Sequence, residues 1–173
     1  MKSTGLFATK QKRNLFFVFL GLSLAVMCVI FVFSAQNGVE SQATSDGLLA
    51  KLLIFVENIF KGSGFGLFLS NLITSAIRRM AHGFIYAVLA FSVSGAIFCL
   101  EIPKKICIKA LFSLLFCLAY AITDEIHQLF VPLRSFEVGD IAVDFIGAFI
   151  GTACFVLIFC IFRAIRKRKD KIS

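Results

Sequence analysis

The sequence predicts an all-α membrane protein: a four-helix transmembrane bundle with one or two extracytoplasmic interfacial or re-entrant helices. Three observations predict this class. Of 173 residues, 59% are apolar and only 16% are charged, so a water-soluble fold would lack the polar coat that it needs. The mean hydropathy is +0.92. Long apolar runs alternate with short polar segments, and the 22 phenylalanines exclude a disordered chain.

Four apolar runs have the length of a membrane span. The first, residues 15–33, has no charge and covers about 28 Å as a helix, which is close to the hydrocarbon thickness of a bilayer. It exceeds the apolar core of a signal peptide, so we expect an uncleaved anchor. The other three spans are expected at 81–100, 106–123 and 141–162.

Two shorter apolar segments, 48–60 and 65–77, lie between the first and second spans. The first has its apolar residues at helical spacing, which is typical of a helix lying in the membrane interface. The second ends at Arg78 and Arg79. It either lies in the interface, dips into the membrane, or forms an added hairpin of two spans with the first. The sequence leaves these alternatives open.

The positive charges predict the orientation. Most of the 18 lysines and arginines lie in the segment 1–14, in the loop between the second and third spans, or in the tail 163–173, which flank a transmembrane domain at 15–162. The positive-inside rule therefore predicts a multi-pass membrane protein with both termini in the cytoplasm. We interpret the basic tail as a patch that sets the topology and binds lipid headgroups. It lacks the stacking aromatics of a nucleic-acid site, so we expect no nucleic-acid partner.

Polar residues gather at the outer ends of the predicted spans. Residues four apart share a helix face, and such pairs recur there: His82 with Tyr86 on the second span, Asp124 with Gln128 at the end of the third, and Asp140 with Asp144 on the fourth. Ionisable groups at membrane depth are stable when they face a protein interior. We therefore expect the outer ends to form one ligand-binding pocket, made by Gln36, Arg79, His82, Tyr86, Asp124, Glu125, Gln128, Arg134, Asp140 and Asp144.

Within this pocket Arg134 is the expected partner of Asp140, Asp144 or Glu125, because a guanidinium can clamp a carboxylate with two hydrogen bonds. The six cysteines lie in or beside apolar runs without a C-x-x-C pair, and they read as small buried hydrophobes. We therefore expect no metal and no cofactor. A G-x-x-x-G at Gly147 and Gly151 allows close helix approach.

These residues carry a family resemblance. The run from Asp124 to Pro132, D-E-I-H-Q-L-F-V-P, followed by Arg134, Asp140 and the G-x-x-x-G, resembles the signature of VanZ-like membrane proteins. The F-S-A-Q end of the first span and R-R-M-A-H with Tyr86 also match. The resemblance covers roughly residues 15–160. Leu133 and Asp144 depart from the family's usual glycine and asparagine. The resemblance implies a cell-envelope role in bacteria, with glycopeptide (teicoplanin) resistance, and no established reaction.

Three functions fit these features. The pocket binds or shields an envelope lipid, a cell-wall precursor or a glycopeptide, with membrane lipids as its surroundings. Alternatively, the chain is a membrane-embedded hydrolase or transferase in which Glu125, His127 and Asp124 are the catalytic candidates. In the third reading the polar residues only hold the helices together, because helices in lipid lack a hydrophobic drive to associate.

Overall fold

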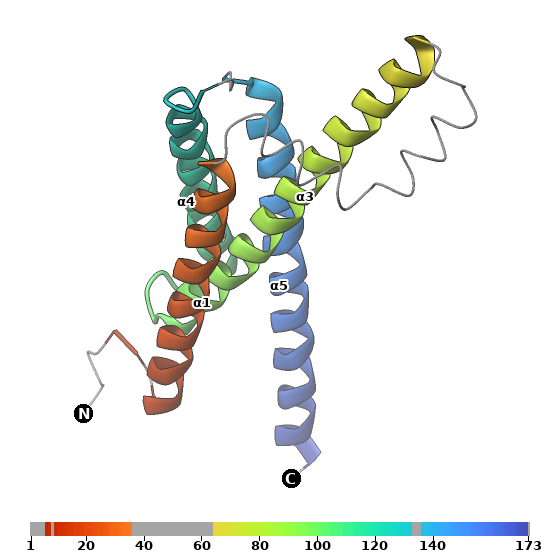
Figure 1. The fold of residues 1–173 in the computed structure, drawn as a ribbon. Helices are drawn as coiled ribbons and strands as arrows, with labels where there is room; N and C mark the ends of the chain where they lie inside the picture. Colours follow the sequence, from red (N-terminus) through yellow and green to blue (C-terminus); the bar gives the residue numbers. More distant parts are fainter. Residues whose placement is uncertain (1–5, 8, 36–63, 133–135, 173) are drawn as a thin grey trace.

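The computed structural model describes residues 6–7, 9–35, 64–132 and 136–172. These form four α-helices and no strand: α1 (Lys10–Ser34), α3 (Gly64–Cys99), α4 (Ile106–Gln128) and α5 (Val138–Ile172). Successive helices run in opposite directions, so that α1 begins and α5 ends at the same end of the bundle (Figure 1). The structure confirms the predicted all-helical class.

Each helix contains a stretch that is long and apolar enough to cross a membrane. Lys10–Ser34 and Ile106–Gln128 are whole helices, whereas Arg79–Cys99 and Val138–Lys169 are parts of α3 and α5. All four overlap the spans predicted from the sequence. The chain is therefore a multi-pass membrane protein, while the side on which its termini lie remains a prediction.

The segment 65–77 is the first half of α3 and continues without interruption into the second span. None of the open alternatives included this continuity. Arg78, Arg79 and Met80 favour a helix interior, so the charge pair does not end the helix. In Figure 1 this half of α3 projects beyond the other three helices. The segment 48–60 lies outside the described residues.

Helix α3 is central to the bundle and packs most extensively against α5. A Cβ atom added to Gly147 would lie 1.9 Å from the backbone oxygen of Gly83, and one added to Gly151 would lie 2.0 Å from that of Ala87. No side chain fits at either position. The close approach expected of the G-x-x-x-G pair is therefore present, with α3 as its partner.

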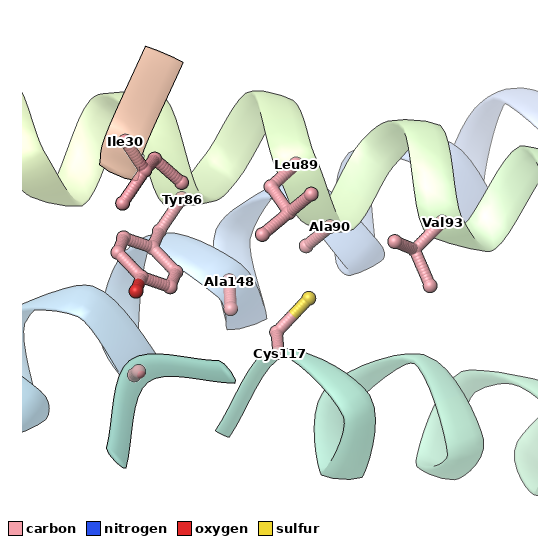
Figure 2. Close-up of a cluster of buried hydrophobic side chains, with 8 residues drawn as sticks. Ile30, Tyr86, Leu89, Ala90, Val93, Cys117 and Ala148 are labelled. Carbon is pink, nitrogen blue, oxygen red and sulfur yellow. The ribbon is translucent and has the colours of Figure 1, made fainter. Parts of the chain in front are cut away.

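A compact cluster fills the space between α3, α4 and α5 (Figure 2), with one residue from α1. Its members are Ile30, Tyr86, Leu89, Ala90, Val93, Cys117, Ala121 and Ala148. Of the six free cysteines only Cys99 and Cys117 are buried. The expectation of buried cysteines is wrong for the other four, because an apolar residue on a membrane helix can face lipid as well as protein.

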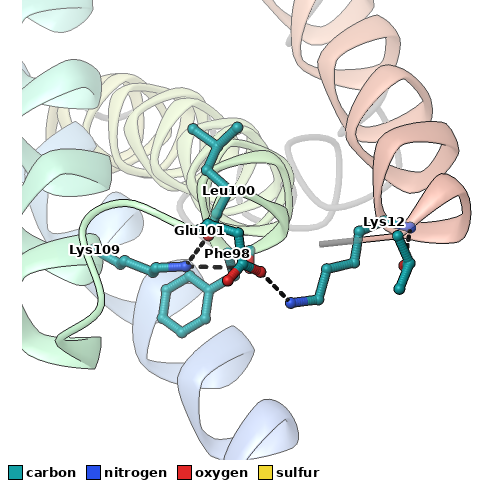
Figure 3. Close-up of polar contacts among 6 residues, drawn as sticks. Lys12, Phe98, Leu100, Glu101 and Lys109 are labelled. Carbon is teal, nitrogen blue, oxygen red and sulfur yellow. Dashed lines mark hydrogen bonds and ion pairs between the residues drawn. The ribbon is translucent and has the colours of Figure 1, made fainter. Parts of the chain in front are cut away.

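Lysines tie the helices together at the end that holds the termini (Figure 3). Lys12 Nζ donates to Glu101 Oε1 at 2.9 Å, which joins α1 to the loop after α3. Lys109 Nζ on α4 donates to the backbone oxygens of Phe98, at 3.3 Å, and of Leu100. A cation here satisfies carbonyl groups that the end of a helix leaves without partners.

Candidate functional site

Polar side chains from α3, α4 and the start of α5 gather at the end of the bundle opposite the termini. We call this set the polar layer. Its described members are Arg79, His82, Tyr86, Asp124, Glu125, Gln128, Glu137, Asp140 and Asp144. Helix α4 ends and α5 begins within this layer, as the turquoise and light-blue ribbons in Figure 1 show. The connection is short, so the last turn of α4 and the first turns of α5 lie at similar depth.

Arg79 joins α3 to the start of α5. Its guanidinium pairs with Glu137, and its Nε lies 2.9 Å from Asp140 Oδ1. The side chains of Arg79 and Glu137 are each 42% exposed, whereas that of Asp140 is 19% exposed. One cation therefore bridges two acids near the surface. The ion pair described for Asp140 is thus with Arg79, and the expected partner Arg134 lies outside the described residues.

Glu125 joins the end of α4 to the residue before α5. Its side chain is buried, and its Oε2 accepts a hydrogen bond of 3.0 Å from the backbone N–H of Glu137. A carboxylate near a helix N-terminus is also favoured by the helix dipole. On the same turn of α4, Gln128 Nε2 donates to Asp124 Oδ2 at 3.3 Å, and both side chains are buried. The predicted face-sharing of Asp124 and Gln128 is confirmed.

The two histidines have different surroundings. His127 stacks on Phe31 of α1, with ring centroids 4.6 Å apart, while His82 is half-buried on α3. Glu125 and His127 are two residues apart on α4, a spacing that places side chains on different faces. Their contacts are consistent with this spacing: Glu125 accepts a hydrogen bond from the residue before α5, and His127 stacks on Phe31 of α1. The structure does not bring these two catalytic candidates together.

Tyr86 and Asp144 form the most buried part of the layer. Tyr86 is fully buried, and in Figure 2 its hydroxyl points away from α3. Asp144 is 2% exposed. Neither the Tyr86 hydroxyl nor Asp144 Oδ1 has a hydrogen-bond partner within the described parts of the chain. Leaving a buried polar atom without a partner costs about 1–3 kcal/mol, so these residues are not a self-satisfied network.

Two polar side chains beside the layer, Tyr120 and Ser34, have contrasting surroundings. The Tyr120 hydroxyl donates to the backbone oxygen of Met27 at 2.8 Å, so its proton is directed to α1 and not to Tyr86, although the two rings lie 6.2 Å apart. Ser34, the last residue of α1, is fully buried, and its Oγ has no partner that the structure describes. Gln36 lies outside the described residues.

Glu137 was missed by the sequence reading. It contacts both Arg79 and Glu125, so it connects all three helices of the layer. Its position just before α5, three residues ahead of Asp140, is where acids stabilise a helix start, and this was the available signal. In the described ranges no three His, Cys, Asp or Glu side chains are grouped so that they could hold a metal ion.

Comparison with known proteins adds one finding. The family model described as VanZ/LLP1 matches residues 19–161. This range contains the whole polar layer, α3, α4 and most of α1 and α5. No curated protein and no solved structure matches the chain.

Proposed function

Because this chain belongs to the VanZ/LLP1 family, we propose that it is a bacterial envelope membrane protein that binds its ligand at the polar layer, on the extracytoplasmic side. The ligand is an envelope lipid, a cell-wall precursor or a glycopeptide. A protein that holds such a molecule at the membrane surface changes how much of it an antibiotic can reach. This would connect binding at the polar layer with teicoplanin resistance.

The observation that carries this proposal is the contrast between two parts of the layer. Arg79, Glu125, Glu137 and Asp140 are engaged with one another through ion pairs and a backbone hydrogen bond. Below them the Tyr86 hydroxyl and Asp144 Oδ1 make no hydrogen bond to any residue that the structure describes. A purely structural network would be fully satisfied, because a partly satisfied one destabilises the fold. The remaining hydrogen-bonding capacity supports a ligand.

The chemistry of the layer favours particular ligand groups. Its described acids are Asp124, Glu125, Glu137, Asp140 and Asp144. Whether ionised or protonated, a carboxyl group offers more acceptor sites than donor sites. Arg79 is already engaged by two of these acids, so it does not support the recognition of a phosphate. Hydroxyl, amide and amine groups, which sugars, peptides and lipid headgroups carry, match this excess of acceptors.

The contacts of Glu125 and His127 do not support the hydrolase or transferase alternative. An acid–base pair must lie within hydrogen-bond reach of one reacting group. Glu125 and His127 instead contact α5 and α1 respectively. We therefore place the binding function first.

The proposal is tested by expressing the chain in a teicoplanin-sensitive bacterium and measuring the minimum inhibitory concentration. Tyr86→Phe and Asp144→Asn remove hydrogen-bonding capacity with little change of shape. We expect both variants to fold, by thermal unfolding in detergent, and to return susceptibility to that of cells without the protein. Thr123→Val is the matched control, because the Thr123 hydroxyl bonds within its own helix to the Ala119 oxygen. Full resistance in folded Tyr86→Phe and Asp144→Asn proteins would contradict the proposal.

A further inference from the structure

Helices α1 and α3 do not close completely against each other. Between them lies a crevice of about 220 Å³, lined by Ala25, Val26 and Val29 of α1 and by Ile85 and Val88 of α3. All five side chains are aliphatic. Ala25 and Val29 are exposed and the other three are half-buried, so the crevice opens at the surface of the bundle.

The crevice lies at hydrocarbon depth, close to the polar layer. Both helices that line it are apolar spans at these residues. Ile85 is six residues from Arg79, which places it about 9 Å further along the axis of α3, and Val29 is about 7.5 Å from Ser34 along α1. A molecule with a polar head at the layer and an apolar chain therefore reaches both features without leaving the protein surface.

The surface of α1 allows the crevice to continue away from the polar layer. Gly21, Ala25 and Val29 are spaced by four residues and so share a face. A Cβ atom added to Gly21 would meet nothing within 4 Å. Gly147 and Gly151 of α5 differ, because the backbone of α3 fills the space beside them. No described residue lies against Gly21, so the crevice is not closed on that side of α1.

We propose that an acyl chain of a membrane lipid occupies this crevice while the headgroup of the same lipid lies at the polar layer. The inference rests on the proposed function and narrows its ligand to a lipid, as opposed to a soluble glycopeptide. Three physical arguments favour an acyl chain. A crevice inside the hydrocarbon region meets lipid chains before any other solute. A second helix approaches closely where small residues repeat, whereas four of the five lining residues are larger than alanine. A polyprenyl chain carries methyl branches that make it thicker than a saturated chain.

The experiment uses the full chain in phosphatidylglycerol vesicles that contain a trace of a glycosyl diacylglycerol, whose headgroup offers hydroxyl groups and no phosphate, with a photoreactive diazirine in its acyl chain. After illumination, labelled peptides are located by mass spectrometry. We expect the lining residues Val26, Val29 and Ile85 to be labelled about tenfold more than Leu157, an exposed residue of α5 that lies outside the crevice.

Two variants separate the crevice from ordinary lipid contact. Ala25→Phe fills the crevice from an exposed position, and we expect it to reduce labelling of the lining about tenfold, equivalent to about 1.4 kcal/mol of affinity. Val18→Phe is the matched control, because Val18 is an exposed residue of α1 outside the lining. It should leave the labelling unchanged.

Three outcomes would overturn the inference: equal labelling of the lining and of Leu157, stronger labelling by a diazirine-bearing polyprenyl phosphate, or efficient disulfide dimerisation of Ala25→Cys in a chain without other cysteines. The susceptibility assay distinguishes failure of the crevice inference from failure of the proposed function. If Tyr86→Phe loses resistance while Ala25→Phe keeps it, the polar layer binds a ligand and the crevice does not contribute. If the crevice is labelled but Tyr86→Phe keeps resistance, the proposed function fails while the crevice still binds a chain.

Discussion

Two aspartates one turn apart on α5 have different surroundings. Asp140 is paired with Arg79, whereas Asp144 Oδ1 is buried without a described partner. We predict that Asp140→Asn lowers the free energy of unfolding by about 1–3 kcal/mol, a range between exposed and buried ion pairs. Asp144→Asn should leave it unchanged or raise it, because an amide avoids burying a carboxylate. Denaturant unfolding in detergent measures both, and an equal loss in the two variants would contradict this assignment.

The Lys12–Glu101 pair should make stability depend on pH. The hydrogen bond and charge of Lys12 hold the pKa of the Glu101 carboxyl below its usual value. A lowered pKa in the folded state stabilises the protein above the usual glutamate range, and this contribution is lost as pH falls through the lowered value. The melting temperature of Glu101→Gln should therefore be below that of the parent at neutral pH.

Acidification is the informative comparison for this pair. The melting temperatures of the parent and of Glu101→Gln should converge as the pH falls below the usual glutamate pKa. Lys104→Gln is the control, because it removes a charge from the same loop and leaves the Lys12–Glu101 hydrogen bond intact. If the difference in melting temperature between the parent and Glu101→Gln stays constant from neutral to acidic pH, Glu101 does not stabilise the protein through its charge.

The sequence predicted which residues share a helix face but not which of them meet. Helical spacing alone placed Asp124 with Gln128, and the structure contains that contact. The partners of Arg79 could not be derived in this way. They depend on how α3 and α5 are rotated about their axes and on the chain between α4 and α5, which brings Glu137 to both Arg79 and Glu125. Spacing along one helix contains no information on either.

At the scale of elements, the packing of α3 on α5 determines the bundle, and it depends on two glycines. We predict that Gly147→Ala and Gly151→Ala each destabilise the protein by about 1–3 kcal/mol or more, the usual cost of overpacking. The new Cβ would overlap a backbone oxygen of α3. Gly21→Ala is the matched control, since nothing lies within 4 Å of its added Cβ. It should be neutral or slightly stabilising. The free energy of unfolding in detergent measures all three variants. An equal loss of stability in Gly21→Ala and in the two α5 variants would contradict this packing.

The positions of the spans followed from the sequence because apolar length is a direct requirement of the bilayer. The continuity of α3 did not follow. A pair of arginines beside an apolar run resembles the end of a span, and hydropathy cannot distinguish a helix that ends from one that continues out of the membrane. In α3 the helix continues on both sides of Arg78 and Arg79.

At the scale of the whole molecule, the two ends of the bundle differ in chemistry. The end that holds the termini carries lysine contacts from Lys12 and Lys109. The opposite end carries the acid-rich polar layer. The positive-inside rule connects this difference to sidedness, and the binding function requires that the polar layer faces away from the cytoplasm.

Sidedness is measured most directly with single cysteines in a chain whose six native cysteines have been replaced. Val138 lies at the polar end and is 70% exposed, and Ile102 lies at the other end and is 73% exposed, so they form a matched pair. A membrane-impermeant maleimide added to intact cells should label Val138→Cys, and it should label Ile102→Cys only after the cells are permeabilised. Labelling of Ile102→Cys but not Val138→Cys in intact cells would place the polar layer in the cytoplasm and contradict the account.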